Sequence, residues 1–293
     1  MPTTIQQSFQ RFRDDLHVTT LQEATVLTRQ KNVRSVMENG LDVLESFVAG
    51  SYSRGTMIAP LKEADIDVFV IIESRYFNNY NGQNGGQAGL LDLVRRTLLR
   101  TYTRTPDISR SGQAVTIRFD DFVVDVVPGF YRQGGGLLIP NSITQSWLST
   151  DPRKHVELVL NANRAHGDSL VPMIRMLKAW NKSHSGFFRS FHLEVLALQI
   201  FAGVTISDFP SGVRYFFDKG RHLIVGKNVD PAGFGDDVGS YINDAAKVEE
   251  ASKKFQLAYE RAIKAEDYAR RGNVIDAVDM WIKIFGDYFP AYG

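Results

Sequence analysis

The stretch FVAGSYSRGTMIAPLKEADIDVFVII, residues 47–72, decides the fold that this sequence predicts. Its second part, from Ile66 to Ile72, is an apolar and largely β-branched run that is typical of a strand buried on both faces. Asp65 and Asp67 open this run, and side chains two apart on a strand point to the same face. Two neighbouring carboxylates repel each other unless a cation lies between them. The pattern therefore predicts a divalent-cation site at the start of a buried strand.

A Gly-Ser turn, Gly50-Ser51, precedes the Asp pair. Its backbone N–H groups and the serine hydroxyl are suited to hold phosphate oxygens. Mg²⁺ usually binds through one or two carboxylates together with substrate phosphates. The order Gly-Ser followed by Asp-x-Asp at a strand start thus indicates metal-assisted transfer onto or from a nucleoside triphosphate.

A further carboxylate lies within a later run that is typical of a strand. Two runs, Ala114–Phe119 and Phe122–Val127, read as strands joined by a turn at residues 120–121. Asp125 lies within the second run between pairs of valines, where a carboxylate is costly to bury unless it is paired or binds a metal. Asp125 is the predicted third metal ligand, with an ion pair to one of the basic residues as the alternative.

The composition excludes several classes of protein. A net charge of +1 provides no overall attraction to nucleic acid or to a membrane. The absence of cysteine excludes disulfides and thiolate zinc sites. The chain opens with no signal-peptide pattern, and no apolar run reaches the ~18 residues of a membrane span. We therefore expect a soluble, cytoplasmic protein that has no membrane partner.

The first half of the chain predicts a helix leading into the Gly-Ser turn. Apolar residues from about Leu21 to Ala49 recur with helical spacing, which predicts one long spine helix or an ordinary packing helix. The polar residues 1–16 are expected to fray or to cap. Residues 76–89 are rich in Asn, Gly and Gln and predict a flexible loop. The segment Leu90–Tyr102 is an amphipathic helix.

The second half of the chain predicts a mainly helical region. Helices are expected over residues 155–163, 169–181, 190–202, 240–271 and 274–285, with a hairpin or irregular loop over 203–239. Lys178 is a lone lysine on the strongly apolar second helix. It either extends its ammonium to water or contacts a phosphate, and Ser190 is expected to cap the helix that follows. The last residues, 289–293, are expected to be disordered or extended on the surface.

Five short motifs in a fixed order carry a resemblance to a known family. They are Gly-Ser, Asp-x-Asp, Asp-Val-Val-Pro, Leu-Lys-x-Trp and Ser-Phe-His-Leu-Glu, beginning at residues 50, 65, 125, 177 and 190. The first two resemble the polymerase-β superfamily. All five together resemble the cGAS/DncV-like nucleotidyltransferases of bacterial cyclic-oligonucleotide anti-phage signalling (CBASS).

This resemblance implies a fold and a division into domains. The fold class is α+β, a polymerase-β-like nucleotidyltransferase core with a mixed sheet packed on a helical C-terminal lobe. The core with its N-terminal spine helix would span residues 20–155. A lobe like that of oligoadenylate synthases would span residues 156–293, with the active site in the cleft between the two.

The resemblance also implies the roles of the site residues. Asp65, Asp67 and Asp125 would be catalytic and would hold two Mg²⁺ (or Mn²⁺) ions per active site. Seven further positions are implied to bind nucleotide. The triphosphate would be contacted by Gly50, Ser51, Lys178 and Ser190. The ring of Phe191 would stack on a base, and Ser149 and Thr150 would read the acceptor base.

The function implied is a metal-dependent, template-independent nucleotidyltransferase that makes a cyclic di- or trinucleotide second messenger from nucleoside triphosphates. A linear oligonucleotide synthase or an RNA-tailing enzyme is the alternative, and a catalytically inactive nucleotide-binding scaffold is a third possibility. Duplex DNA is not an expected partner, because the Cys/His zinc element of animal cGAS is missing. The resemblance further implies a regulatory or E1/E2-like partner protein that acts on the C-terminus.

Overall fold

The computed structural model describes residues 2–60, 64–103 and 107–293. The chain divides into two compact units. One unit consists of Val18–Glu157, and the other combines Met1–His17 with Leu158–Gly293. The boundary at residues 157–158 lies within helix α6, Pro152–Ala165.

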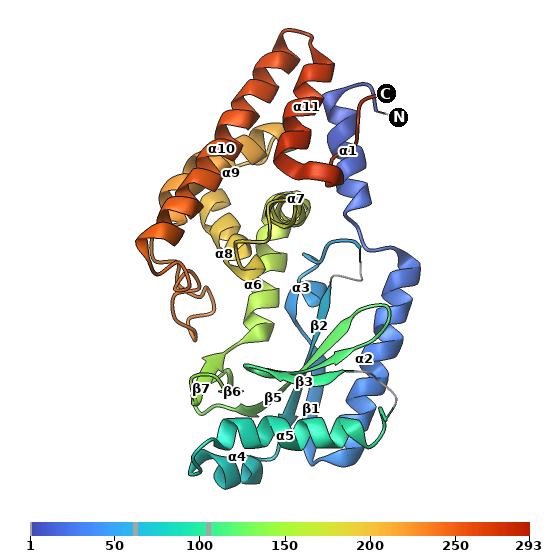
Figure 1. The fold of residues 1–293 in the computed structure, drawn as a ribbon, viewed down its shortest axis with the longest axis vertical. Coiled ribbons are helices and arrows are strands. Elements are labelled where there is room, and N and C mark those ends of the chain that lie inside the picture. Colours follow the sequence, from blue (N-terminus) through green and yellow to red (C-terminus); the bar gives the residue numbers. More distant parts are fainter. Residues whose placement is uncertain (1, 61–63, 104–106) are drawn as a thin grey trace. The chain divides into compact units, whose positions relative to one another are not determined.

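The unit of residues 18–157 is built on a seven-stranded mixed sheet (Figure 1). The main order is β1-β2-β5-β4-β3, and β6 and β7 extend it from the end of β5. β2 and β5 are parallel, and every other pair is antiparallel. The strands are β1 Val43–Val48, β2 Asp65–Ile72, β3 Ile108–Ser111, β4 Ala114–Arg118, β5 Val123–Tyr131, β6 Leu137–Asn141 and β7 Ser146–Thr150.

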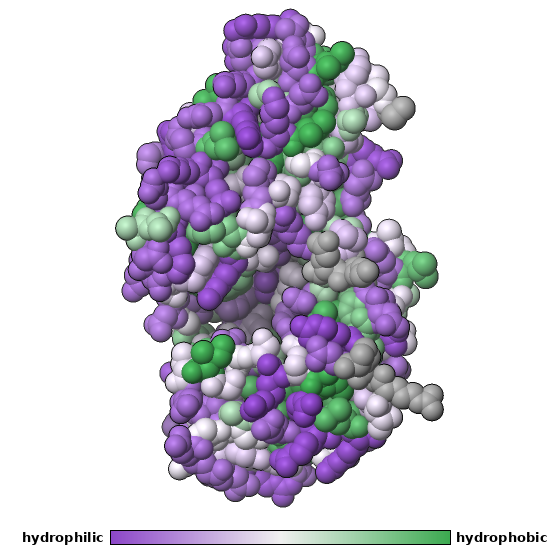
Figure 2. Space-filling model, viewed as in Figure 1, coloured by the Kyte–Doolittle hydropathy of each residue, from purple (hydrophilic) through white to green (hydrophobic). Residues whose placement is uncertain are grey.

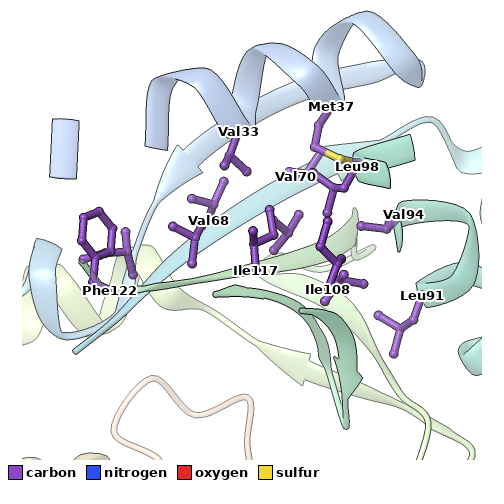
Figure 3. Packing of buried hydrophobic residues seen from close by; sticks show 14 of the residues in the cluster. Val33, Met37, Val68, Val70, Leu91, Val94, Leu98, Ile108, Ile117 and Phe122 are labelled. Carbon is purple, nitrogen blue, oxygen red and sulfur yellow. The ribbon is translucent and has the colours of Figure 1, made fainter. Parts of the chain in front are cut away.

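Helices cover the sheet and close its main core. Apart from α6, the helices of this unit are α2 Thr20–Gly40, α3 Gly50–Ser53, α4 Ser74–Asn81 and α5 Gly86–Leu99. Figure 3 shows side chains of α2 and α5 meeting those of the sheet in one apolar layer. The labelled members of this layer are Val33, Met37, Val68, Val70, Leu91, Val94, Leu98, Ile108, Ile117 and Phe122.

The predicted long helix ends earlier than its apolar spacing suggests. α2 stops at Gly40, and residues 43–48 form β1 on the edge of the sheet beside β2. A Cβ on Gly40 would lie 2.3 Å from the Cγ2 atom of Thr97 on α5, so only glycine allows the two helices to approach this closely. The prediction of helix to residue 49 is wrong because β1 completes backbone pairing with β2, a long-range gain that local periodicity does not report.

Two other local predictions are corrected. The Asn/Gly-rich residues 76–89 lie mainly in α4 and in the start of α5, with a short connection between them. The expected irregular segment 203–239 contains a helix, α9 Phe209–Leu223, which begins where the Asp208 carboxylate accepts the N–H of Ser211. α9 has a buried apolar face, and the aromatic residues of α4 pack partly buried against the core. Polar residues between these positions obscure the helical spacing in the sequence.

The second unit is helical. Besides part of α6 and α9, it contains α1 Ile5–Asp15, α7 Leu170–Ser183, α8 Ser190–Phe201, α10 Ala245–Arg270, α11 Val274–Phe285 and the short 3₁₀ helix η2 Gly286–Tyr288. α10 packs along both α9 and α11. The helices expected at 169–181, 190–202, 240–271 and 274–285 are all present, with bounds that differ by a few residues at most.

The two ends of the chain pack together in an aromatic cluster, which sequence patterns did not predict. The Phe9 ring centroid lies 5.1 Å from that of Phe289 and 4.9 Å from that of Trp281. Phe12 lies 4.7 Å from Phe285. Phe289 is buried, while residues 291–293 are exposed. Residues 5–15 form α1 instead of fraying. In the tail expected on the surface, Phe289 is tightly buried because the four phenylalanines bury one another, and only residues 291–293 are exposed.

The visible face of the molecule in Figure 2 carries mostly hydrophilic side chains, with apolar residues in small separate groups. Within the described ranges, no helix is both long and apolar enough to span a membrane.

Candidate active site

Two of the three predicted carboxylates lie side by side on parallel strands. Asp67 of β2 is the register partner of Asp125 of β5, so their Cα atoms are about 4.8 Å apart, the usual spacing of neighbouring strands. Asp65 is the exposed first residue of β2, two positions before Asp67 and so on the same face of the strand. Asp67 and Asp125 are half-buried where the apolar parts of their strands begin.

Thr116 supports Asp125 from the neighbouring strand. It is the register partner of Asp125 on β4, and its hydroxyl donates to the Asp125 Oδ1 atom at 2.6 Å. Thr116 is 5% exposed, so this hydrogen bond is largely protected from water. The bond fixes one carboxylate oxygen and leaves the other to face a ligand.

Gly50 brings the Gly-Ser turn against Asp67. Gly50 has φ +66°, a conformation that favours glycine. A Cβ at this position would lie 1.7 Å from the Asp67 Oδ2 atom. In addition, the Ala49 N–H donates to the backbone carbonyl of Asp67 at 2.9 Å. Any side chain at residue 50 would therefore displace the carboxylate.

Ser51 follows in the single-turn helix α3. Its backbone carbonyl accepts the N–H groups of Thr56 at 2.9 Å and Met57 at 3.1 Å, which fixes the turn. The Ser51 hydroxyl makes no hydrogen bond to the part of the chain that the structure describes, and the residue is half-buried. This hydroxyl is thus available to a ligand beside the Asp67 carboxylate.

The side chains gathered here suit a hard divalent cation. Carboxylate oxygens are the ligands that Mg²⁺ and Mn²⁺ prefer. Asp67 and Asp125 are register partners, and the Asp67 carboxylate lies directly against Gly50. Among the residues described, no group of three or more His or acidic side chains is arranged as a metal site. The convergence of all three aspartates therefore stays a prediction.

Ser149 and Thr150 lie on β7 and not in a loop. Their register partners on β6 are Leu138 and Leu137, and both are half-buried. Because consecutive residues of a strand point to opposite faces, only one of the two side chains can face a base on a given side of this hairpin. Of the two residues implied to read the acceptor base, Ser149 and Thr150, only one can therefore do so.

Lys178 is placed differently from both sequence expectations, which put its ammonium in water or on a phosphate. The Lys178 Nζ atom lies 2.6 Å from Glu194 Oε1, and the two side chains are only 5% and 1% exposed. They join α7 to α8 inside the C-terminal unit. The structure thus provides a buried carboxylate partner where the resemblance implied a phosphate.

Ser190 and Phe191 lie in the first turn of α8. Ser190 is the exposed first helical residue, and Phe191 is half-buried. The prediction that Ser190 caps this helix is wrong, because Arg189 is the N-cap residue and no side chain makes the capping hydrogen bond. The Arg189 backbone N–H donates to the Tyr241 hydroxyl at 3.1 Å.

Three residues of these sites were not predicted as functional, namely Thr116, Glu194 and Tyr241. Their types are common in strands, helices and loops, and their importance comes from long-range pairing. A sequence signal exists only for Glu194, which ends the Ser-Phe-His-Leu-Glu motif that begins at Ser190.

Comparison with known proteins identifies relatives over most of the chain. Residues 3–163 match the family model described as the Second Messenger Oligonucleotide or Dinucleotide Synthetase domain. A "Probable cyclic nucleotide synthase" of Bacillus cereus is 23% identical and covers 89% of this chain and 88% of its own. A "Cyclic AMP-AMP-AMP synthase" of Acinetobacter sp. is also 23% identical, over 98% of this chain and 86% of its own.

The fold also matches solved structures. The cyclic AMP-GMP synthase DncV of Vibrio cholerae, in complex with the linear intermediate 5′ pppA(3′,5′)pG, superposes with a TM-score of 0.76. The two chains are 14% identical, and the match covers 99% of this chain and 97% of DncV. The α+β nucleotidyltransferase fold with a helical C-terminal part is thereby confirmed.

Proposed function

This chain belongs to the family of second messenger oligonucleotide or dinucleotide synthetases, and from this premise we propose how its residues carry out the reaction. As a cGAS/DncV-like nucleotidyltransferase, it joins nucleoside triphosphates into a cyclic di- or trinucleotide second messenger. In each transfer, a ribose hydroxyl oxygen of the acceptor forms a bond to the α-phosphorus of the donor. The bond from that phosphorus to the oxygen between the α- and β-phosphates breaks. Pyrophosphate leaves, and the hydroxyl proton is released.

The observation that supports the catalytic roles best is the pairing of Asp67 with Asp125 beside Gly50. Asp65, Asp67 and Asp125 would hold two Mg²⁺ (or Mn²⁺) ions, which lower the pKa of the acceptor hydroxyl and stabilise charge on the phosphates. The hydrogen bond from Thr116 keeps the Asp125 carboxylate oriented toward the ligand. Because it has no side chain, Gly50 allows the Gly-Ser turn to lie directly against the Asp67 carboxylate, which would hold a metal-bound phosphate near the N–H groups of the turn.

Further contacts are proposed for the nucleotides themselves. Ser51 donates its hydroxyl to the donor triphosphate, and backbone N–H groups at Gly50-Ser51 add to this contact. Ser190 contacts the same phosphates, and the Phe191 ring stacks on a base. Either Ser149 or Thr150 reads the acceptor base. Lys178 contacts the triphosphate through an ammonium that also pairs with Glu194, since an ammonium has three N–H donors.

The experiment is to incubate the protein with each nucleoside triphosphate mixture and Mg²⁺ or Mn²⁺, and to identify the products by mass spectrometry. Asp67→Asn should abolish pyrophosphate release while the protein stays folded, because removal of one of several clustered carboxylates relieves repulsion. Asp92→Asn is the matched control, since Asp92 forms a half-exposed ion pair with Arg110. Normal turnover by Asp67→Asn would refute the metal site. Linear products of increasing length would point to an oligonucleotide-tailing enzyme.

We also propose that a regulatory or E1/E2-like partner protein acts on the exposed end of the chain. Residues 291–293 are exposed, although Phe289 anchors the segment just before them. Co-expression with such a partner should give a conjugate of higher mass that is lost when Tyr292 and Gly293 are deleted. An unmodified chain beside an active partner would contradict this proposal.

A further inference from the structure

The loop that precedes α10 contacts the first turn of α8 through the side chain of Tyr241. The Tyr241 hydroxyl accepts the backbone N–H of Arg189 at 3.1 Å and lies 3.0 Å from His192 Nδ1. The guanidinium carbon of Arg189 lies 4.6 Å from the centroid of the Tyr241 ring. The His192 ring meets the same tyrosine edge to face, with centroids 5.7 Å apart. Four contacts thus converge on one tyrosine.

The donor and acceptor roles in these hydrogen bonds follow from the chemistry of Tyr241, Arg189 and His192. The Tyr241 hydroxyl has one proton, and it accepts from Arg189, so it is free to donate this proton to Nδ1 of a neutral His192. The pKa of His192 is lowered to about 4, mainly by burial; the Asp237 charge opposes this shift and the Arg189 charge adds to it. Burial also raises the pKa of Tyr241. Both groups are therefore neutral near pH 7, and the contact persists.

Tyr241 itself extends from an ordered loop. The Asp237 Oδ1 atom accepts the N–H groups of Asn228 and Gly239, each at 2.9 Å. A Cβ on Gly239 would lie 3.0 Å from the His192 ring, so this loop packs closely against α8. The loop therefore provides a fixed base from which Tyr241 can position the Arg189 side chain.

Arg189 carries a positive charge that the described part of the chain does not neutralise. It is exposed, and no carboxylate within the described ranges pairs with its guanidinium. The other guanidinium that stacks closely on a tyrosine in this unit behaves differently: Arg221 lies 4.4 Å from the Tyr259 ring centroid and also binds Asp218 at 2.8 Å. Arg189 is thus held in place without a counter-charge, beside Ser190.

We propose that Arg189 contacts the phosphates of a bound nucleoside triphosphate and that Tyr241 is the positioning residue that holds Arg189 and the first turn of α8 for this contact. The proposal rests on the proposed function, since it places Arg189 beside the nucleotide contact assigned to Ser190. A guanidinium matches phosphate oxygens with two parallel hydrogen bonds. The cation–π contact with Tyr241 reduces the side-chain freedom that binding would otherwise remove.

The test compares nucleotide binding with catalysis. Arg189→Gln should raise the KM and the directly measured Kd for ATP, GTP, CTP or UTP by about tenfold, the loss of one charge-assisted hydrogen bond. It should leave kcat and the Kd for the corresponding nucleoside unchanged, because a nucleoside has no phosphates. Arg189→Lys should recover part of the affinity. The matched control is Arg221→Gln, which removes the other ring-stacked guanidinium and should change neither constant.

Tyr241→Phe tests the positioning role, since it keeps the aromatic ring and removes only the hydroxyl. It should raise KM for the triphosphates by about three- to tenfold, while Tyr259→Phe should not. Equal triphosphate Kd values for Arg189→Gln and Arg221→Gln would overturn the phosphate contact, and equal KM values for the two tyrosine variants would overturn the positioning role. Binding of triphosphates without any product would contradict the proposed function alone, whereas no triphosphate binding by the unmodified protein would overturn both.

Discussion

Lys178→Met should destabilise the C-terminal unit strongly rather than weaken nucleotide binding alone. The Lys178 ammonium and the Glu194 carboxylate are 2.6 Å apart, and neither side chain is more than 5% exposed. Removal of one member of a buried ion pair typically costs roughly 3–5 kcal/mol, because the remaining buried charge loses the closest opposite charge. Since whole proteins are stable by only about 5–15 kcal/mol, this is a large fraction of the total. At about 2–4 °C per kcal/mol, Tm should fall by roughly 6–20 °C.

Urea and thermal unfolding measure this effect, and a double-mutant cycle isolates it. Glu194→Gln should also destabilise, whereas the apolar pair Lys178→Met with Glu194→Leu should recover most of the loss, because no buried charge remains. The control is Lys154→Met, which breaks a surface pair with Glu157 and should cost about 0.5 kcal/mol or less. A Lys178→Met protein with unchanged Tm and a much higher KM for every triphosphate would refute the buried-pair interpretation and support a phosphate contact.

Three further predictions concern other parts of the chain. Thr116→Val should lower activity by about 10- to 100-fold with little change in fold, measured as pyrophosphate release, because the Asp125 carboxylate loses the hydroxyl that orients it. Burial lowers the pKa of His192 from 6.5 to about 4, so the unfolded chain binds the proton first as pH falls. Stability should decline by about 3 kcal/mol between pH 6.5 and 4, and His192→Phe should reduce this slope in urea titrations. Phe289→Ala should cost about 3–5 kcal/mol by opening the cluster around Phe9, and an unchanged Tm would show that the end of the chain is loosely packed.

Sequence alone was sufficient where one strong local signal specified both the element and its role. The apolar run after Asp67 specifies a buried strand, and a lone aspartate in the valine-rich strand at Asp125 indicates a ligand or a paired charge. α7 and α11 carry clear helical periodicity, and α11 was predicted with its observed bounds, Val274–Phe285. The resemblance drawn from the five motifs is confirmed by the family match over residues 3–163.

The features that were missed depend on contacts that are distant in sequence. β1 forms because β2 pairs with it, although its apolar residues also continue the period of α2. Phe289 is buried because Phe9 and Phe12 of α1 meet it from the opposite end of the chain. Lys178 was expected to extend to water or to contact a phosphate because it is a lone lysine on an apolar helix, whereas its partner Glu194 comes from the next helix. In each case the sequence shows the residue or segment but does not identify the distant strand or side chain that it contacts.

The parallel pairing of β2 with β5 builds the core of the first unit and fixes its candidate site in the same step. Ile66 and Val68 face opposite to Asp67 and are fully buried, as are Val124 and Val126 beside Asp125. A slip of one residue between the strands would bury a carboxylate in the apolar core and expose a valine, so the hydrophobic pattern specifies the register. Because this register alone brings Asp67 level with Asp125, the free energy that stabilises the sheet also maintains the repulsion between the two carboxylates. A cation bound there, as proposed above, would relieve that repulsion, so the folding of the core would prepare the strand starts for metal.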